Sequence, residues 1–383
     1  MSEAERPWSV PLADVTVEHE LVSAATEAVS SGWWSMGPRV QEFERAFATF
    51  CDARHSFAVA NGTAALHLAL LAVGCGPDDE VVLPSLNFVA AANTIVHTGS
   101  TPVFCDIGRP PDLNLDPADL EAAIGPRTKA VVVLHYGGFA CDMGAVLDAA
   151  ERHGVAVIED AAHAPGSRSA GRPCGTIGKV GCFSFFSNKN LPVGEGGMVV
   201  TNDDEVAERV RLLRSHGMTT LTWDRHRGHA ASYDVVTQGF NYRLDEMRAA
   251  IGLVQLRRLT GENAARARIG AQYREELERH GVSMAFADRL GDPASAHHLA
   301  VALFRDERAR ERVRLHLRDR RIQTSIHYPP IHRFSAYREL GVRRALPQTD
   351  AVADRLLTLP LFGRMDGDQV AAVVAAVREA GGT

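Results

Sequence analysis

The sequence predicts an α/β fold with a mixed, mostly parallel sheet that carries helices on both faces. Two observations support this prediction. Short apolar segments of strand length alternate along the chain with longer segments whose apolar residues recur at helical spacing. The strand-like segments are apolar almost throughout, which is typical of strands buried on both faces. With 383 residues, of which 45% are hydrophobic, the chain is long enough for one large core and a smaller second core.

The elements are expected in a regular order. Helices are predicted over 40–50, 64–73, 140–153 and 204–216, and strands over 80–84, 101–105, 130–134, 155–159, 181–186 and 197–201. A helical pattern from 244 to 259 continues to residue 280 and leads into a different arrangement. There, strands near 298–304 and 323–327 flank a helix over 307–320. We therefore predict a large domain over residues 1–260 and a smaller C-terminal α+β domain over residues 261–383.

Composition and charge exclude several classes of protein. The net charge of −6 provides no positive field for a nucleic acid, and the arginines between 305 and 321 alternate with acidic residues, as on a solvated helix face. No apolar run reaches the ~18 residues that span a bilayer, and the N-terminus lacks a signal-peptide pattern. The six cysteines are scattered without a Cys-x-x-Cys pair. We expect a cytoplasmic protein without a metal site, a membrane or a nucleic acid partner.

One lysine stands between an apolar strand and a glycine-rich turn. Lys189 follows the segment 181–186 and precedes Gly-Glu-Gly-Gly at 194–197, a setting that disfavours its ammonium form. Such a lysine is a candidate for a Schiff base with an aldehyde. Asp160 ends the predicted strand 155–159, where ligands bind in open α/β sheets, and a carboxylate there could hold a protonated pyridine nitrogen. The alternatives are a loop lysine and a helix N-cap. Together the two residues predict pyridoxal 5'-phosphate.

Other residues meet the remaining needs of that cofactor. The turn with Gly62, Thr63 and Ala64 before a helical run is a candidate phosphate site, although it could be an ordinary capped helix. Ser184 could add a hydroxyl. Phe88 follows a predicted strand and could stack on the ring, although most phenylalanines are core residues. His163 could contact the ring or be a hydrogen-bonded structural histidine.

Linked motifs along nearly the whole chain support a resemblance to a known family. They are Gly37-Pro38, Asn61 to Leu66, Asp79 to Val81, Phe88 to Ala90, Glu159 to His163, Ser184 to Asn190, Gly196 to Asn202, Gly239 to Leu244 and Ile326 to Pro329. In this order they resemble the sugar aminotransferases of the DegT/DnrJ/EryC1/StrS family. The resemblance is specific because many motifs recur together.

The resemblance implies a fold-type I pyridoxal phosphate enzyme that works as a homodimer with active sites shared between subunits. It implies a Schiff base at Lys189, a pyridine partner in Asp160, and His163 beside the ring hydroxyl. Its remaining cofactor contacts would be Gly62, Thr63, Ala64 and Ser184 at the phosphate, Phe88 on the ring face, and Asn241 from the partner subunit. The donor would be an amino acid, L-glutamate by analogy, and the acceptor a keto-sugar.

The acceptor is the open point of the prediction. By the family pattern, the sugar or its nucleotide would be bordered by Trp33, Trp34, Tyr242, Arg243, His327 and Tyr328. Arg243 suits a diphosphate, although it could equally pair with Asp245. The sequence differs from the family's usual motifs on the predicted substrate side, in segments 86–88, 135–139 and 187–188. Nucleotide-linked keto-sugars are favoured over free keto-cyclitols. The loop 221–232 is expected to cross to the partner subunit and cover its site.

Two other functions compete with transamination. A pyridoxal phosphate-binding regulator without turnover would keep the same pocket. A nicotinamide dehydrogenase is disfavoured because no Gly-x-Gly-x-x-Gly follows an early strand. Some relatives have histidine in place of the lysine and act as sugar dehydratases, so Lys189 favours transamination. The expected role is an enzyme of amino-sugar or natural-product biosynthesis, such as that of antibiotics.

Overall fold

A seven-stranded sheet forms the centre of the molecule. The computed structural model describes residues 8–220, 223, 226, 228, 232–338, 340 and 344–381. The strands lie in the order β1-β9-β8-β5-β4-β2-β3. Their bounds are β1 (His55–Val59), β2 (Glu80–Pro84), β3 (Thr101–Cys105), β4 (Thr128–Leu134), β5 (Ala156–Asp160), β8 (Val180–Ser184) and β9 (Gly197–Thr201). Only β9 runs against its neighbours in this sheet, and the predicted mixed, mostly parallel sheet is confirmed.

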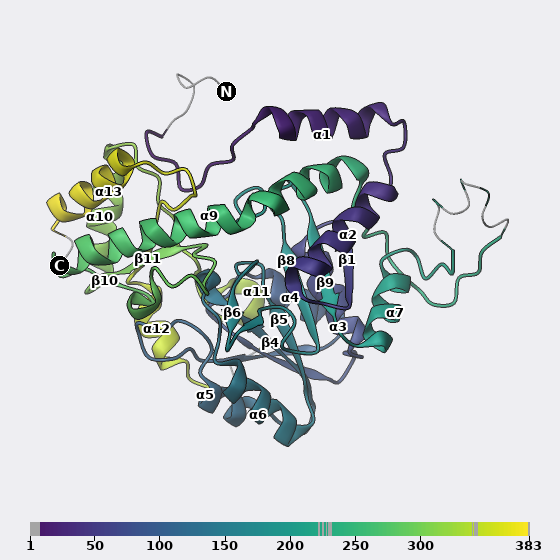
Figure 1. The fold of residues 1–383 in the computed structure, drawn as a ribbon. Coiled ribbons are helices and arrows are strands. Elements are labelled where there is room, and N and C mark those ends of the chain that lie inside the picture. Colours follow the sequence, from purple (N-terminus) through teal and green to yellow (C-terminus); the bar gives the residue numbers. More distant parts are fainter. Residues whose placement is uncertain are drawn as a thin grey trace.

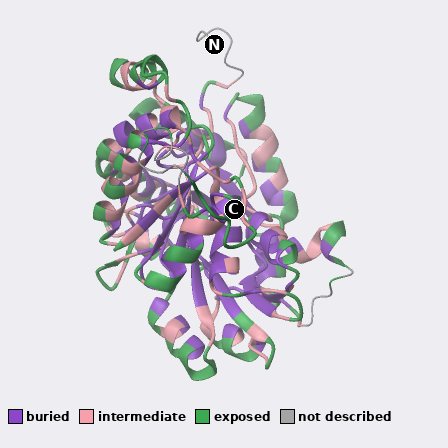
Figure 2. Cartoon of the chain, turned by 90° about the vertical axis from the view of Figure 1, so that its right-hand side faces the viewer, coloured by how far each residue is buried: buried purple, intermediate pink, exposed green. Residues whose placement is uncertain are grey.

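Helices cover both faces of this sheet, as Figure 1 shows. One face packs against α3 (Gly62–Ala72), α4 (Ala90–His97) and α7 (Asp204–Leu213), and the other against α2 (Pro38–Cys51), α5 (Pro117–Ala123), α6 (Met143–His153) and part of α9 (Glu246–Glu278). Val81 and Leu83 belong to the first core, whereas Val82 between them belongs to the other. Successive strand residues point to opposite faces. Most strand positions are apolar because both faces are buried (Figure 2).

A second, smaller sheet lies at the other end of α9. It contains β10 (Ser283–Met284), β11 (Ala300–Leu303) and β12 (Leu356–Leu359), all antiparallel, with α10 (Glu307–Asp319) and α13 (Gly367–Glu379) packed beside them. Val10 pairs with Ile322, so the start of the described chain joins this region. Leu259 packs in the core of the large sheet and Ile269 in the other core. Helix α9 thus connects the two regions, and the division at residue 260 stays a prediction.

The remaining elements are short or peripheral. Helix α1 (His19–Ser30) lies along α9, as Figure 1 shows, and α11 (Ser335–Arg338) and α12 (Pro347–Ala353) precede β12. Strands β6 (Arg168–Ser169) and β7 (Arg172–Pro173) form a small hairpin. Within the described ranges, no helix is long and apolar enough to cross a bilayer. The same residues contain no group of three or more His, Cys, Asp or Glu side chains placed to hold a metal ion.

Most predicted elements match the structure, and two differences have physical causes. The predicted strand 323–327 is wrong: in this segment only Ser325 pairs, in an isolated bridge to Thr358 of β12. Pro329 and Pro330 follow after Tyr328, and proline cannot donate to a strand ladder. β1 was not predicted. It is short, and it lies at the sheet edge beside β9, which comes more than a hundred residues later, so local sequence carries little signal for it.

Candidate active site

A cavity of about 410 Å³ opens at the carboxyl ends of β4, β5 and β8. This is where open α/β sheets bind ligands, and the volume lies within the usual range for small-molecule sites. Of the residues predicted from the sequence, those lining the cavity are Gly62, Thr63, Phe88, Asp160, His163, Ser184, Lys189, His327 and Tyr328. Leu134, Asp160 and Ser184 are the last residues of their strands. The parallel strands therefore bring together side chains that are far apart in the sequence.

Lys189 lies in the turn after β8, where its backbone N–H donates to the carbonyl of Phe186 at 2.8 Å. Burial lowers the pKa of Lys189 to about 8, and the nearby carboxylate of Asp160 opposes this shift. At pH 7 about one in ten of these side chains is therefore the neutral amine, the form that attacks an aldehyde.

Asp160 is buried, yet its carboxylate is nearly unpaired. One oxygen accepts the N–H of Ala162 at 3.1 Å, and within the described part of the chain no other donor reaches the carboxylate. Burial raises the pKa of Asp160, and the Ala162 N–H and Lys189 partly offset this effect. A buried carboxylate in this state is stabilised by a cation, and the protonated nitrogen of a pyridine ring is such a cation.

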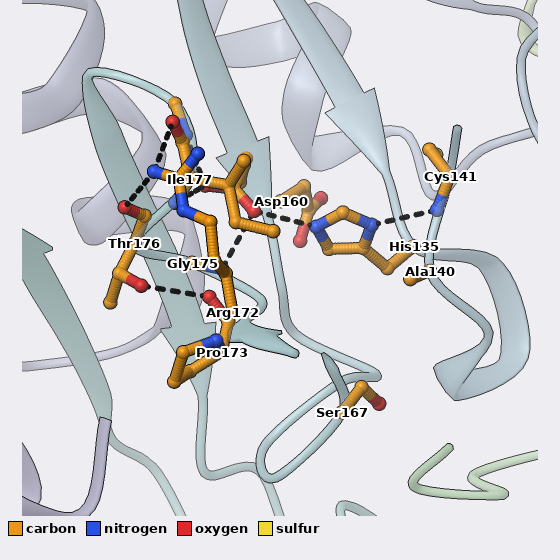
Figure 3. Close-up of polar contacts among 12 residues, drawn as sticks. His135, Ala140, Cys141, Asp160, Ser167, Arg172, Pro173, Gly175, Thr176 and Ile177 are labelled. Atoms are coloured by element: carbon orange, nitrogen blue, oxygen red, sulfur yellow. Dashed lines mark hydrogen bonds and ion pairs between the residues drawn. The ribbon is translucent and has the colours of Figure 1, made fainter. Parts of the chain in front are cut away.

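The preceding residue, Glu159, is fully satisfied by the protein itself. Its carboxylate accepts the N–H groups of Gly175 at 2.7 Å, Ile177 at 2.7 Å and Gly178 at 2.6 Å, and the Nε2 of His135 lies 2.9 Å away. Figure 3 shows His135 between this cluster and the backbone of Cys141, whose N–H donates to Nδ1 at 3.1 Å. Because Nδ1 accepts, Nε2 carries the proton and donates to Glu159. Glu159 thus fixes the 175–178 turn.

The start of α3 provides an anion site. The side chain of Asn61 caps this helix by accepting the N–H of Ala64 at 2.8 Å, so that donor is already used. The N–H groups of Gly62 and Thr63 have no acceptor among the described residues. A Cβ added at Gly62 would lie 2.8 Å from the Cβ of Ser184, so only glycine fits this close approach. Free N–H groups at a helix N-terminus beside two hydroxyls suit a phosphate.

His163 and Tyr328 form a hydrogen-bonded pair on the cavity wall. The N–H of Gly137 donates to Nδ1 of His163 at 3.3 Å, and Nε2 lies 2.9 Å from the hydroxyl of Tyr328. Nε2 is therefore protonated and donates to Tyr328. Burial and the neighbouring cation of Lys189 lower the pKa of His163 well below its usual value, and lower that of His327 to about 4. Both histidines are neutral at pH 7.

Phe88 presents its ring to the cavity. The side chain is 54% exposed although the chain around it is buried, and its centroid lies 5.7 Å from that of Tyr328. An exposed ring at the edge of a ligand cavity is available for stacking on a flat ligand.

Six predicted site residues are not among those that line this cavity, namely Trp33, Trp34, Ala64, Asn241, Tyr242 and Arg243. Trp34 is 58% exposed and its indole donates to the carbonyl of Val29 at 3.0 Å. Asn241 is exposed and Arg243 half-buried, and the hydroxyl of Tyr242 lies 3.2 Å from Nδ1 of His67.

The predicted pairing of Arg243 with Asp245 is not found. Asp245 instead accepts from Nε of Arg248 at 2.7 Å. The loop expected to cross to a partner, 221–232, lies largely outside the described residues. Of its described members, Trp223 packs on Trp33 with ring centroids 4.8 Å apart.

Four further residues line the cavity, and sequence reasoning did not single them out as site residues. Phe186 and Glu195 were missed, whereas Asn87 and Asn188 lie in the segments 86–88 and 187–188 that were expected on the substrate side. Phe186 is 44% exposed, which is unusual for an aromatic residue directly after a buried strand. The available signal was position: each of the four lies within six residues of Phe88 or Lys189 in the sequence.

The residues present fit pyridoxal phosphate. A half-buried amine with a lowered pKa, a nearly unpaired carboxylate, free N–H groups at a helix start and an exposed aromatic ring all face one cavity. These are the four groups that the aldehyde, pyridine nitrogen, phosphate and ring face of the cofactor require.

Comparison with known proteins agrees with this geometry. The model of the DegT/DnrJ/EryC1/StrS aminotransferase family matches residues 15–378. The spore coat polysaccharide biosynthesis protein SpsC of Bacillus subtilis is 42% identical over 97% of this chain and 96% of its own length. The structure of the aminotransferase TlmJ from Streptoalloteichus hindustanus superimposes with a TM-score of 0.89 at 36% identity, over 97% of this chain and 98% of TlmJ.

The sugar aminotransferase CalS13 from Micromonospora echinospora gives a TM-score of 0.87 at 31% identity, over 97% of this chain and 99% of CalS13. These similarities extend over nearly the whole chain, so they include both the cofactor cavity and the C-terminal region. The chain therefore belongs to the DegT/DnrJ/EryC1/StrS aminotransferase family, and it is a pyridoxal phosphate-dependent aminotransferase of fold type I.

Proposed function

We propose that this enzyme moves an amino group from L-glutamate to the keto group of a nucleotide-linked sugar, in amino-sugar biosynthesis. The observation that carries the proposal is Lys189, an amine with a lowered pKa facing Asp160 in the cavity. CalS13 is named a sugar aminotransferase, and SpsC is named for polysaccharide biosynthesis. Polysaccharides are assembled from activated sugars, which favours a nucleotide-linked acceptor over a free keto-cyclitol.

Lys189 has two tasks in this reaction. Its neutral amine would hold the cofactor, and the same amine, once free, would be the base that takes the α-proton of the donor. When bound, pyridoxal phosphate supplies an electron sink for the carbanion that this proton transfer creates. A pKa of about 8 leaves Lys189 able both to take and to return a proton near neutral pH.

Other residues position the reactants. Asp160 would keep the pyridine nitrogen of the cofactor protonated, because among the described residues its buried carboxylate has only the Ala162 N–H as a partner. The neutral His163 holds the hydroxyl of Tyr328 in place on the cavity wall. Phe88 would cover one face of the cofactor ring and so limit the access of water.

We propose that the enzyme is a homodimer with shared sites. Trp34, Asn241, Tyr242 and Arg243 lie outside the cavity of their own subunit, so a partner's cavity is where they would act. Several exposed apolar side chains suit an interface, namely Trp34, Phe88, Phe186, Val235 and Val236. All six cysteines are buried and free, which suits the reducing cytoplasm.

A nucleotide diphosphate would require cations that the cavity itself lacks. Among the described residues that line it, there is no arginine. Arg243 has no ion pair within the described chain, and burial together with Arg214 lowers its pKa. An unpaired guanidinium of this kind suits a phosphate group, supplied either by the acceptor or by the partner's cofactor.

The proposal is tested by trapping and by an acceptor screen. Borohydride should fix the cofactor on Lys189 in the wild-type enzyme, and Lys189→Ala should lose both the fixed cofactor and turnover. Lys179→Ala is the matched control, since Lys179 is exposed and pairs with Asp203 at 3.1 Å. The amino form of the enzyme is then offered dTDP-4-keto-6-deoxyglucose and 2-keto-myo-inositol.

Conversion of the nucleotide sugar supports the proposal. Conversion of 2-keto-myo-inositol alone would mean that the acceptor is a free keto-cyclitol. If glutamate changes the cofactor absorbance and neither ketone reacts, the sugar assignment is wrong. If glutamate causes no change, the protein binds the cofactor without turnover.

A further inference from the structure

Two segments that contribute to the active-site cavity are joined by hydrogen bonds behind its wall. Ser85 directly follows β2, is fully buried, and contacts His332 of the C-terminal region. Its Oγ lies 2.7 Å from Nδ1 of His332 and accepts the backbone N–H of the same residue at 3.2 Å. Its carbonyl accepts the N–H of Ile331 at 2.9 Å. Ser85 is therefore bonded at three points to a segment that lies far along the chain.

The protons of this pair have one arrangement when the imidazole is neutral. Nε2 of His332 lies 3.3 Å from the carboxylate of Asp350, which accepts, so Nε2 carries the ring proton. Nδ1 then accepts the hydroxyl proton of Ser85. The same hydroxyl oxygen accepts the N–H of His332, so both its donor and an acceptor position are used. Hydrogen bonds are directional, and this pair therefore holds the two backbones at a defined separation.

The pair lies where the C-terminal region meets the large sheet. Ile331 is buried in a core of the large sheet, whereas Tyr328 packs against the core of the smaller sheet. The segment 328–332 thus passes from one core to the other. At its start the hydroxyl of Tyr328 lies 2.9 Å from Nε2 of His163. This segment is therefore anchored on the cavity wall at one end and to Ser85 at the other.

Each member of the pair is close in sequence to an aromatic ring of the cavity. Phe88 follows Ser85 by three residues, and Tyr328 precedes His332 by four. Both rings line the cavity, with their centroids 5.7 Å apart. The chain between Ser85 and Phe88 is tightly turned, because the N–H of Asn87 donates to the carbonyl of Ser85 at 3.0 Å. A displacement of Ser85 would therefore displace Phe88 as well.

We propose that Ser85 and His332 are positioning residues, which set the place of Phe88 opposite Tyr328 and so determine how tightly the cofactor ring is held. Neither is among the residues that line the cavity, so both act through their neighbours. The inference rests on the proposed contact of Phe88 with the ring, and it does not depend on the acceptor. Such supporting contacts matter because a displacement of about 1 Å near a reacting group lowers rates on the order of a hundredfold.

The first test measures the binding of pyridoxamine phosphate to the apoenzyme. This compound has an amine in place of the aldehyde, so it binds without a covalent bond to Lys189, and fluorescence titration gives its dissociation constant. Ser85→Ala and His332→Ala remove the same hydrogen bond from opposite sides, and each should weaken binding about five- to tenfold. His332→Asn, whose Oδ1 accepts in place of Nδ1, should stay within about twofold of the wild type.

Arg333→Ala is the matched control for the first test. It removes ion pairs to Asp350 at 2.6 Å and to Asp354 at 2.9 Å in the same region and leaves Ser85 untouched. Its binding should equal that of the wild type. The proposal is wrong if Arg333→Ala is weakened as much as His332→Ala, or if Ser85→Ala and His332→Ala bind like the wild type. Cooperative thermal unfolding identifies the variants that fold, and either member of the pair suffices for the test.

The second test asks whether the pair acts through Phe88. Phe88→Leu removes the flat ring and should by itself weaken the binding of pyridoxamine phosphate about tenfold. The double variant with Ser85→Ala should then be at most about twofold weaker than Phe88→Leu, because the ring that Ser85 positions is already absent. Losses that multiply in the double variant would show that Ser85 acts on another group, and they would overturn the proposal.

This proposal and the proposed function fail in different ways. If Phe88→Leu binds pyridoxamine phosphate like the wild type, Phe88 does not contact the ring and the role given to Ser85 and His332 is wrong. The acceptor screen uses the wild-type enzyme, so it decides the transfer to a keto-sugar independently of these variants.

Discussion

Glu159 and Asp160 are adjacent carboxylates at the end of β5, and they have opposite surroundings. Glu159 accepts three backbone N–H groups and lies 2.9 Å from Nε2 of His135. Asp160 accepts one, from Ala162. Burial would raise the pKa of Glu159, but hydrogen bonds from His135 and the 175–178 turn hold it below its usual value. The pKa of Asp160 is raised.

The difference separates a structural group from a functional one. Successive residues of a strand point to opposite sides, so one carboxylate faces the protein and the other faces the cavity. Where the fold supplies every partner, the residue contributes stability. Where the fold withholds partners from a buried group, that group is kept for a ligand at a cost in stability.

The largest expected effect is on the rate of Asp160→Asn. This variant should lose about 10²- to 10⁴-fold in kcat, because the neutral amide no longer keeps the pyridine nitrogen protonated. Its apoenzyme should be no less stable than the wild type at pH 7. The raised pKa means that ionisation of Asp160 costs stability as pH rises above 3.8, and asparagine removes that cost. Steady-state kinetics and urea unfolding at pH 5 and pH 8 measure both effects.

An Asp160→Asn variant that was less stable than the wild type at pH 7 but kept its rate would reverse the roles given to Asp160 and Glu159. It would show that this carboxylate supports the fold and that another group protonates the cofactor.

For Glu159→Gln, in contrast to Asp160→Asn, we expect a loss of stability. The amide keeps the size of the side chain but turns an NH₂ group toward N–H donors, so unfolding free energy should fall by about 2–4 kcal/mol. Because the pKa of Glu159 is lowered, its contribution to stability is present above pH 4.5 and is lost as pH falls below that value. Urea unfolding measures the loss.

Glu208→Gln is the control, because this exposed residue pairs with Arg211 at the surface and its change should stay below about 1 kcal/mol. If Glu159→Gln unfolds like Glu208→Gln, the network around Glu159 contributes no stability.

The rate at which the apoenzyme binds pyridoxal phosphate tests how Asp160 acts on Lys189. Because the pKa of Lys189 is lowered to about 8, the rate should rise about tenfold per pH unit below 8 and level off above it. Stopped-flow absorbance measures the rate. The carboxylate of Asp160 raises the pKa of Lys189, so Asp160→Asn should move the plateau to lower pH. A rate that rises steadily up to pH 10 would mean that burial does not lower the pKa of Lys189.

The smallest effect is expected for Tyr328→Phe. The change removes the hydroxyl that lies 2.9 Å from Nε2 of His163 and leaves the ring in place. Loss of this one hydrogen bond should lower kcat/KM about three- to tenfold. A loss above a hundredfold in steady-state assays would mean that Tyr328 itself moves a proton in the reaction.

Much of the fold could be predicted because strands buried on both faces are apolar at most positions. Three predicted strands coincide with β2, β3 and β9. The strand over 323–327 was wrong, because its residues serve the cavity and a bridge to Thr358 instead of a ladder. The pairing of Val10 with Ile322 joins residues about three hundred positions apart, and no local pattern encodes such a contact.

The sequence by itself determined the residue types that the chemistry needs. Lys189 after an apolar strand and Asp160 at the end of another are local patterns, and the parallel topology follows from the alternation of helices and strands. Only the tertiary structure decided which polar groups have partners. Glu159 and Asp160 are neighbouring carboxylates, and the sequence alone does not separate their roles. They differ because hydrogen bonds are short-range and directional, so whether a buried group is satisfied depends on the segments that the fold brings within about 3 Å of it.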